Sequence, residues 1–119
     1  MSADLRNVKS LIIVFAMKGC PACEEYTPKL VQFVQGFQAH GIPFVFYTHG
    51  ELAPGQIPVL VYDAAAQDPD VQALADQYKV EALPTTVLLA RNARPVKLEG
   101  ALEDNQIYEL LASAAIASR

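Results

Sequence analysis

Two cysteines separated by two residues are the part of the sequence best suited to chemistry: Cys20-Pro21-Ala22-Cys23. They stand between a short apolar run, residues 11–16, and a segment with helical periodicity. A thiol at the start of a helix faces unpaired backbone N–H groups and the positive end of the helix dipole, which favour the thiolate. We therefore predict that Cys20 is the exposed nucleophile. Cys23, one turn along, is predicted to be the less exposed, resolving thiol.

The same spacing also occurs in half of a zinc site, so a metal-binding interpretation has to be weighed. Zinc would need two more ligands, and His40 and His49 are the only histidines. They lack the short spacing of paired histidine ligands, and we place His40 at a helix end and His49 in a polar loop. Inert, buried cysteines are the other alternative, but a Cys-Pro pair between a strand and a helix is an exposed position. We expect no bound metal.

Length and composition exclude several classes of protein. The 119 residues are 52% hydrophobic and 18% charged, with a net charge of −4, which suits one soluble domain. The chain is acidic and has only nine Lys and Arg residues, which argues against binding nucleic acid through its phosphates. No apolar run approaches the ~20 residues of a membrane span, and residues 11–16 are too short for a secretory signal. We expect a monomer in the cytoplasm. In that reducing compartment, paired cysteines serve redox or metal chemistry rather than a permanent cross-link.

Hydrophobic periodicity, together with capping and breaking residues, predicts the helices and strands that position the two cysteines. Strands are expected at residues 11–16, 42–48, 57–63, 85–90 and 96–99, and helices at residues 4–9, 21–39, 69–78 and 104–117. Pro28 lies inside the long helix and should bend it. Asp68 can cap the next long helix, and Pro69 suits its first position. A strand–helix–strand unit followed by a hairpin and a closing helix builds a sheet covered on both faces.

These features together resemble the thioredoxin superfamily, and thioredoxin more than glutaredoxin. The resemblance covers residues 11–39 and 67–117, and it rests on the apolar strand, the Cys20–Cys23 pair, Pro28 and the stretch Tyr-Lys-Val-Glu-Ala-Leu-Pro-Thr-Thr at residues 78–86. It implies one thioredoxin-like domain over residues 1–119, a three-layer α/β/α sandwich. Its central mixed sheet would have four to five strands, with the N-terminal strand shortened or absent. Residues 42–48 and 57–62 would then pair, the extra strand covering the vacated edge.

The resemblance also implies site residues beyond the cysteines. Pro84 matches the family's cis-proline, which packs against the cysteine pair, and the backbone of Leu83 would pair with an extended substrate segment. Lys18 is a candidate for stabilising the Cys20 thiolate through its positive charge. The expected substrate-binding residues are Gly19, Pro21, Ala22, Leu83, Pro84, Thr85 and Gly100.

Three departures from the family bear on mechanism. Val14 stands where thioredoxins carry a buried Asp, and no Lys lies between Lys29 and Lys79 to partner such an acid. Losing both members of a buried ion pair together can be neutral, whereas losing one is costly. Gly19 replaces the aromatic residue that usually precedes the pair. We therefore expect thiol exchange to continue without an acid that assists the deprotonation of Cys23.

The expected activity is reduction of protein disulfides through a reversible Cys20–Cys23 disulfide, with no other cofactor bound. A thioredoxin-reductase-type enzyme or glutathione would supply the electrons. One alternative is a glutathione-dependent, glutaredoxin-like enzyme. The other is a thioredoxin-fold binding module in which the cysteines have no turnover.

Overall fold

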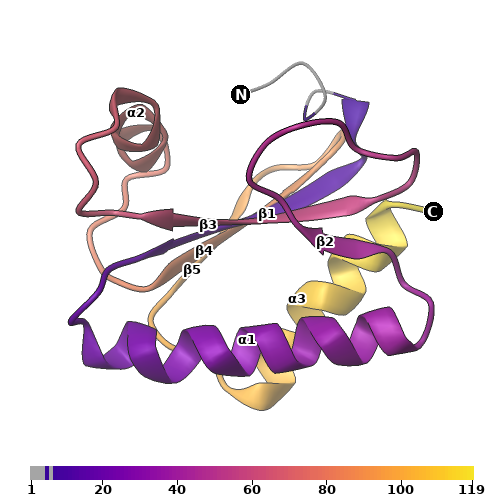
Figure 1. Ribbon diagram of the computed structural model, residues 1–119, viewed down its shortest axis with the longest axis horizontal. Helices are drawn as coiled ribbons and strands as arrows, with labels where there is room; N and C mark the ends of the chain where they lie inside the picture. Colours follow the sequence, from indigo (N-terminus) through magenta and orange to yellow (C-terminus); the bar gives the residue numbers. More distant parts are fainter. Residues whose placement is uncertain (1–4, 6) are drawn as a thin grey trace.

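The computed structural model describes residue 5 and residues 7–119, and the strands of this part form one five-stranded mixed sheet between helices (Figure 1). The elements are β1 (Ser10–Ala16), α1 (Pro21–Ala39), β2 (Phe44–Phe46), β3 (Ile57–Asp63), α2 (Pro69–Gln77), β4 (Thr85–Ala90), β5 (Val96–Glu99) and α3 (Asp104–Ala117). The sheet order is β2-β3-β1-β4-β5. Helices α1 and α3 cover one face and α2 covers the other (Figure 1). This confirms the three-layer arrangement.

Strand β1 lies in the middle of the sheet, parallel to β3 and antiparallel to β4. Ile12 and Val14 are fully buried in the cluster shared with α1 and α3. Ile13 and Phe15 are fully buried on the opposite face, in a cluster that contains Val71 of α2. Because both faces are covered, the strand is an unbroken apolar run rather than an alternating one. It fixes the point where the chain emerges toward the cysteines.

The two strand-like runs in the middle of the chain do pair, with β3 inside the sheet and β2 parallel to it at the edge. The prediction of a strand over residues 42–48 was too long. Ile42 instead donates its backbone N–H to Phe37 O, 3.1 Å away, and so belongs to the end of α1. At the other end, Tyr47 N–H donates to Val59 O at 3.0 Å before the chain turns away. In the described part of the chain, no strand precedes β1.

The helices begin and end close to the predicted residues. The bounds of α1 and α3 are confirmed, while α2 ends one residue early because Tyr78 forms its C-cap. Asp68 caps α2 and Pro69 begins it. α1 continues through Pro28, and the bend expected there stays a prediction. The short helix expected over residues 4–9 falls partly on residues outside those described.

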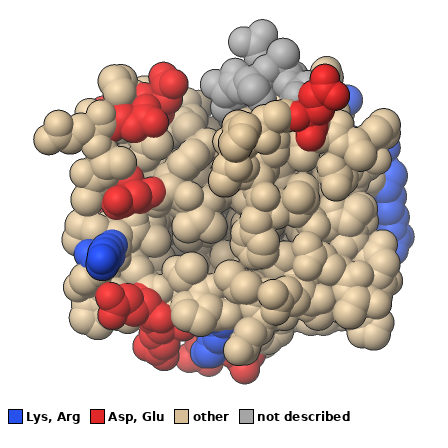
Figure 2. All heavy atoms as spheres, in the orientation of Figure 1, with Lys and Arg blue, Asp and Glu red and all other residues tan. Residues whose placement is uncertain are grey.

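The surface seen from the side of β2 is mostly uncharged. Acidic and basic residues lie around the rim of this face, and its centre is largely free of both (Figure 2). Phe46 of β2 and Val61 of β3 are exposed to 38% and 43%. Among the helices that the structure describes, none combines the length and apolar character needed to cross a bilayer.

Candidate active site

Cys20 is the N-cap residue of α1. Its backbone is extended, with φ −90° and ψ 111°, and Pro21 occupies the first helical turn. Gly19, with φ +84°, makes the left-handed turn that brings the chain from β1 to this position. Cys20 Sγ accepts a hydrogen bond from Cys23 N–H at 3.3 Å, which satisfies one of the free donors at the helix start. Cys20 is half-buried, less exposed than predicted, and its role as the nucleophile stays a prediction.

Cys23 lies one turn along α1 and is 3% exposed. Its thiol donates to Cys20 Sγ, and the two sulfur atoms are 2.6 Å apart. Burial raises the pKa of Cys23, and its hydrogen bond to Cys20 raises it further. Cys23 is therefore held as a thiol beside its neighbour. A half-buried Cys20 thus lies beside a buried, protonated Cys23, and the roles of nucleophile and resolving thiol stay predictions.

The loop before β4 approaches the cysteines from the other side. The Leu83–Pro84 peptide bond is cis, as the resemblance implied. Leu83 O lies 3.8 Å from Cys20 Sγ. Pro84 O accepts a hydrogen bond from Gly100 N–H at 2.7 Å, so the start of the last loop is tied to the same place. The structure thus brings Leu83, Pro84 and Gly100 together beside Cys20.

Thr85 is different from these neighbours. It is fully buried, and its hydroxyl donates to Ala82 O at 2.6 Å. The side chain therefore shapes the loop from inside, and its expected contact with a substrate gains no support. Pro84 is also buried, while Leu83 and Gly100 are half-buried, and Gly19 and Pro21 are exposed. Ala22 is half-buried between the cysteines. Of the expected substrate-binding residues, Gly19, Pro21, Ala22, Leu83 and Gly100 are therefore at least partly accessible.

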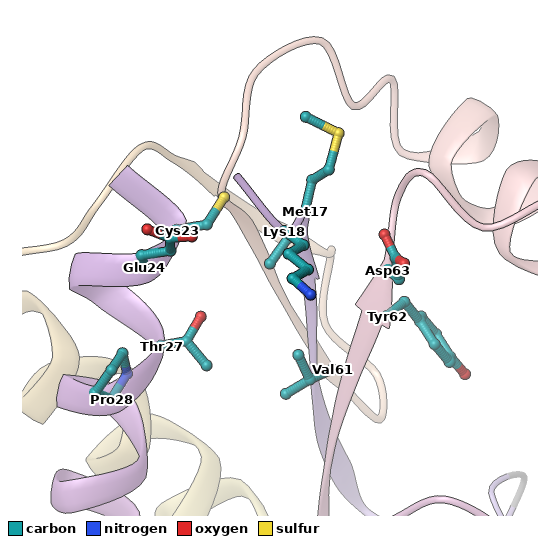
Figure 3. Close-up of a pocket in the computed structure, with 10 residues that line it drawn as sticks. Met17, Lys18, Cys23, Glu24, Thr27, Pro28, Val61, Tyr62 and Asp63 are labelled. Atoms are coloured by element: carbon teal, nitrogen blue, oxygen red, sulfur yellow. The ribbon is translucent and has the colours of Figure 1, made fainter. Parts of the chain in front are cut away.

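An open groove of about 490 Å³ lies between the start of α1 and the ends of β1 and β3. Figure 3 shows its walls, with Cys23, Glu24 and Thr27 on the helix side and Val61 on the strand side. Lys18 reaches down this groove with its ammonium turned toward Val61 (Figure 3). Lys18 is therefore directed away from Cys23 (Figure 3), and its charge effect on Cys20 stays a prediction.

Glu24 is a residue of the site that the sequence analysis missed. Its Oε1 accepts a hydrogen bond from Gly19 N–H at 3.2 Å, reaching back over the turn that precedes Cys20. An acidic residue in the first turn of a helix is a common signal of such backward capping, and Glu24 carries it. The acidic residue in the first turn could be seen in the sequence, but its hydrogen-bond partner, the Gly19 N–H, could not.

Val14, which the resemblance matches to a buried acid of the family, lies in β1 in the middle of the sheet. It is fully buried and aligned with Val61 and Thr86 in the neighbouring strands. Thr86 Oγ1 and Tyr26 Oη form a buried hydrogen bond of 2.9 Å. Burial raises the pKa of Tyr26, so its hydroxyl remains protonated.

His40 lies far from the sulfur atoms. His40 is the C-cap of α1, separated from Cys20 by the full length of a 19-residue helix, about 28 Å. Cys20 and His40 therefore cannot bind one metal ion. Among the described residues, no three His, Cys, Asp or Glu side chains converge on a common point.

Comparisons with known proteins agree with this architecture. The thioredoxin-like domain family matches residues 2–115. No curated protein sequence matches the chain. Among solved structures, chloroplastic thioredoxin z is 22% identical, the aligned region covers 96% of this chain and 85% of that chain, and the TM-score is 0.64.

Two further structures show the same likeness. Thioredoxin-2, described as a component of the malaria parasite protein secretion machinery, is 17% identical over 88% of this chain and 82% of that chain, with a TM-score of 0.62. A mutant thioredoxin from Halobacterium salinarum is 18% identical over 94% and 80%, with a TM-score of 0.60. Identities this low show a shared fold. Because the family match spans nearly the whole sequence, the chain belongs to the thioredoxin-like domain family.

Proposed function

We propose that this protein is a thiol–disulfide oxidoreductase that reduces protein disulfides through Cys20 and Cys23. One observation carries the proposal: a half-buried sulfur at the N-cap of α1 stands 2.6 Å from a buried thiol one turn along. The accessible sulfur can meet a substrate, and the buried one can meet only its neighbour. Such a pair is suited to two successive exchange steps.

In the first step, the Cys20 thiolate attacks one sulfur of a substrate disulfide. A Cys20–substrate disulfide forms, the substrate S–S bond breaks, and the second substrate sulfur leaves as a thiolate. In the second step, Cys23 loses its proton and attacks Cys20 Sγ. The Cys20–Cys23 disulfide forms and the remaining substrate sulfur leaves as a thiolate. The substrate gains two electrons and the cysteine pair loses two, while protons pass through solvent.

The surroundings of Cys20 support a polypeptide substrate. Leu83 presents its carbonyl oxygen 3.8 Å from Cys20 Sγ, at the end of a loop that leads into β4. An extended substrate segment could use the Leu83 backbone as a short pairing edge, as in strand addition. Gly19, Pro21, Ala22 and Gly100 would border that segment. Small residues dominate this border, so little stands in the way of an approaching chain.

The donor completes the cycle. The two sulfur atoms carry the electrons, so the proposed reaction uses no other bound cofactor. A thioredoxin-reductase-type enzyme or glutathione would return the oxidised pair to its dithiol. We propose that the protein works as a monomer in the cytoplasm, where such donors keep thiols reduced.

The test combines a redox titration with an activity assay. The pair is equilibrated with mixtures of oxidised and reduced dithiothreitol, and insulin disulfide reduction is then followed with each donor system. A reversible two-electron transition and insulin reduction supported by thioredoxin reductase are expected. Activity with glutathione and glutathione reductase alone would favour the glutaredoxin-like alternative. A pair that does not cycle would contradict the proposal and leave a binding module.

A further inference from the structure

Glu24 is a charged residue of the site that the exchange steps do not use. Its carboxylate Oε1 accepts the Gly19 N–H at 3.2 Å, and its own backbone N–H donates to Cys20 O at 3.0 Å. Its side chain also lines the groove together with Cys23, and Figure 3 shows the two side by side at the start of α1. One residue therefore contacts the turn before Cys20 and borders the thiol after it.

The turn at Gly19 has little other support. Apart from its chain neighbours, no atom lies within 4 Å of where a Cβ would stand at Gly19, and the backbone there is left-handed at φ +84°. Cys20 N–H donates to Met17 O over 3.3 Å, which is a long hydrogen bond. The bond from Gly19 to Glu24 ties this exposed turn back to the rigid helix. It thereby limits how far the Cys20 backbone can move.

The tether also fixes a negative charge at the turn that leads to Cys20, on the residue that follows Cys23. A thiolate at the N-cap and a carboxylate in the first turn both draw on the positive end of α1, and they repel each other. The other charged residues of the groove are oriented elsewhere. Lys18 turns its ammonium toward Val61 (Figure 3), and Asp63 Oδ1 accepts the N–H of Ala65 at 2.9 Å.

We propose that Glu24 is a positioning residue that ties the Gly19 turn to α1 and makes the cysteine pair more strongly reducing. The inference rests on the proposed function. Reduction to the attacking form of the pair, a Cys20 thiolate beside a Cys23 thiol, consumes two electrons and one proton. A fixed carboxylate nearby opposes the formation of that thiolate, so it stabilises the disulfide relative to the reduced pair.

Three variants separate the charge from the tether. Glu24→Gln keeps an oxygen acceptor for Gly19 N–H but removes the charge, and Glu24→Ala removes both. Glu25→Gln is the matched control, because Glu25 is the next residue and lines a separate hollow with Lys29 and Asp104. In a dithiothreitol redox titration at pH 7, Glu24→Gln should shift the equilibrium toward the reduced pair by about threefold to tenfold. That shift is about 15 to 30 mV. Glu25→Gln should leave it unchanged.

Amide hydrogen exchange at Gly19 tests the tether. Glu24→Ala should speed exchange of the Gly19 N–H at least severalfold, and Glu24→Gln should keep it near that of the unmodified protein. Equal shifts in potential for Glu24→Gln and Glu25→Gln, or no shift in either, would overturn the inference, as would unchanged Gly19 exchange in Glu24→Ala. If the unmodified pair does not cycle, the proposed function fails as well. If the unmodified pair cycles and the Glu24 and Glu25 variants behave alike, this inference fails while the proposed function stands.

Discussion

The starts of helices α1 and α2 are built in the same way but from different atoms. Each begins with a cap residue in extended conformation followed by proline, Cys20-Pro21 in α1 and Asp68-Pro69 in α2. In each, the cap side chain accepts a backbone N–H. Asp68 Oδ1 accepts from Asp70 at 2.9 Å, and Cys20 Sγ accepts from Cys23 at 3.3 Å.

The difference lies in what each cap is able to do. A carboxylate is a strong acceptor, whereas sulfur is a weak one, so α1 gains less from its cap. Helix α1 compensates through packing, since Tyr26, Leu30 and Val34 are fully buried along 19 residues. Of the nine residues of α2, all within the described part, Val71 alone is buried. A long, well-packed helix can therefore carry a reactive but poor cap, while a short one depends on a good cap.

The largest expected effect comes from replacing the reactive cap with a better one. Cys20→Ser should reduce insulin disulfide reduction to the uncatalysed rate, because a hydroxyl does not exchange with disulfides. The unfolding free energy of the reduced protein should stay level or rise by up to about 1 kcal/mol, since serine is a preferred N-cap. Asp68→Ser is the matched change in α2 and should leave the activity intact. A Cys20→Ser protein that still reduces insulin would remove the distinction between the two caps.

The second prediction concerns the proton of Cys23. Only its thiolate can attack Cys20, and burial, the main cause of its raised pKa, persists when Cys20 is bound to a substrate. Release of a chromogenic thiol from its mixed disulfide with Cys20 should accelerate about tenfold per pH unit from pH ~6 to ~9. Rapid-mixing absorbance measurements follow this release. An inflection between pH ~4 and ~6 would reveal an assisting carboxylate, contrary to the buried Val14.

The same raised pKa affects stability in the reduced protein. Above the ordinary value of 9.0, the unfolded chain releases the Cys23 proton while the folded protein retains it. The contribution of Cys23 to stability is therefore complete below pH 9.0 and decreases as the pH rises through its higher value in the folded state. Denaturant titrations of the reduced protein and of Cys23→Ala should diverge in this range. Parallel curves would contradict the assignment.

Features fixed by local sequence were predictable. The bounds of α1 and α3, the cap and proline of α2, and the paired cysteines at a helix start depend on neighbours within a few residues. The cis Leu83–Pro84 bond was expected from the family resemblance alone, because a Leu-Pro sequence does not choose its isomer. The strand pairing of β2 and β3 followed from counting strand-like runs.

Features that depend on particular hydrogen bonds and on packing were not predictable. β2 begins later than predicted because the Ile42 N–H bonds to Phe37 O at the end of α1, which no periodicity reveals. The direction of Lys18 depends on a groove formed by three elements. Thr85 adjoins the active loop in sequence, yet it faces the interior because its hydroxyl bonds to Ala82 O. Side-chain direction at a loop is decided by packing, and the pattern of residue types does not encode it.

A smaller effect is expected from weakening the good cap. Asp68→Ala removes the acceptor for Asp70 N–H and should lower the unfolding free energy by about 1 kcal/mol. The activity of the folded protein should not change, because α2 lies on the face of the sheet opposite α1 (Figure 1). Urea denaturation and insulin reduction measured on the same sample check both parts. A loss of stability below a few tenths of a kcal/mol would show that α2 depends less on its cap than its sparse burial indicates.

The smallest effects come from the two prolines at the same helical position. Pro69→Ala and Pro21→Ala should each lower the unfolding free energy by about 0.5 kcal/mol, because proline restricts the unfolded chain. Of these two prolines, only Pro21 lies between two cysteines in the sequence. Its ring fixes the backbone that holds them together, so Pro21→Ala should make the disulfide easier to open by about twofold, or about 10 mV. Pro69→Ala should leave the redox titration unchanged. Equal titrations for both variants would mean that the proline of α1 serves the helix alone, as the proline of α2 does.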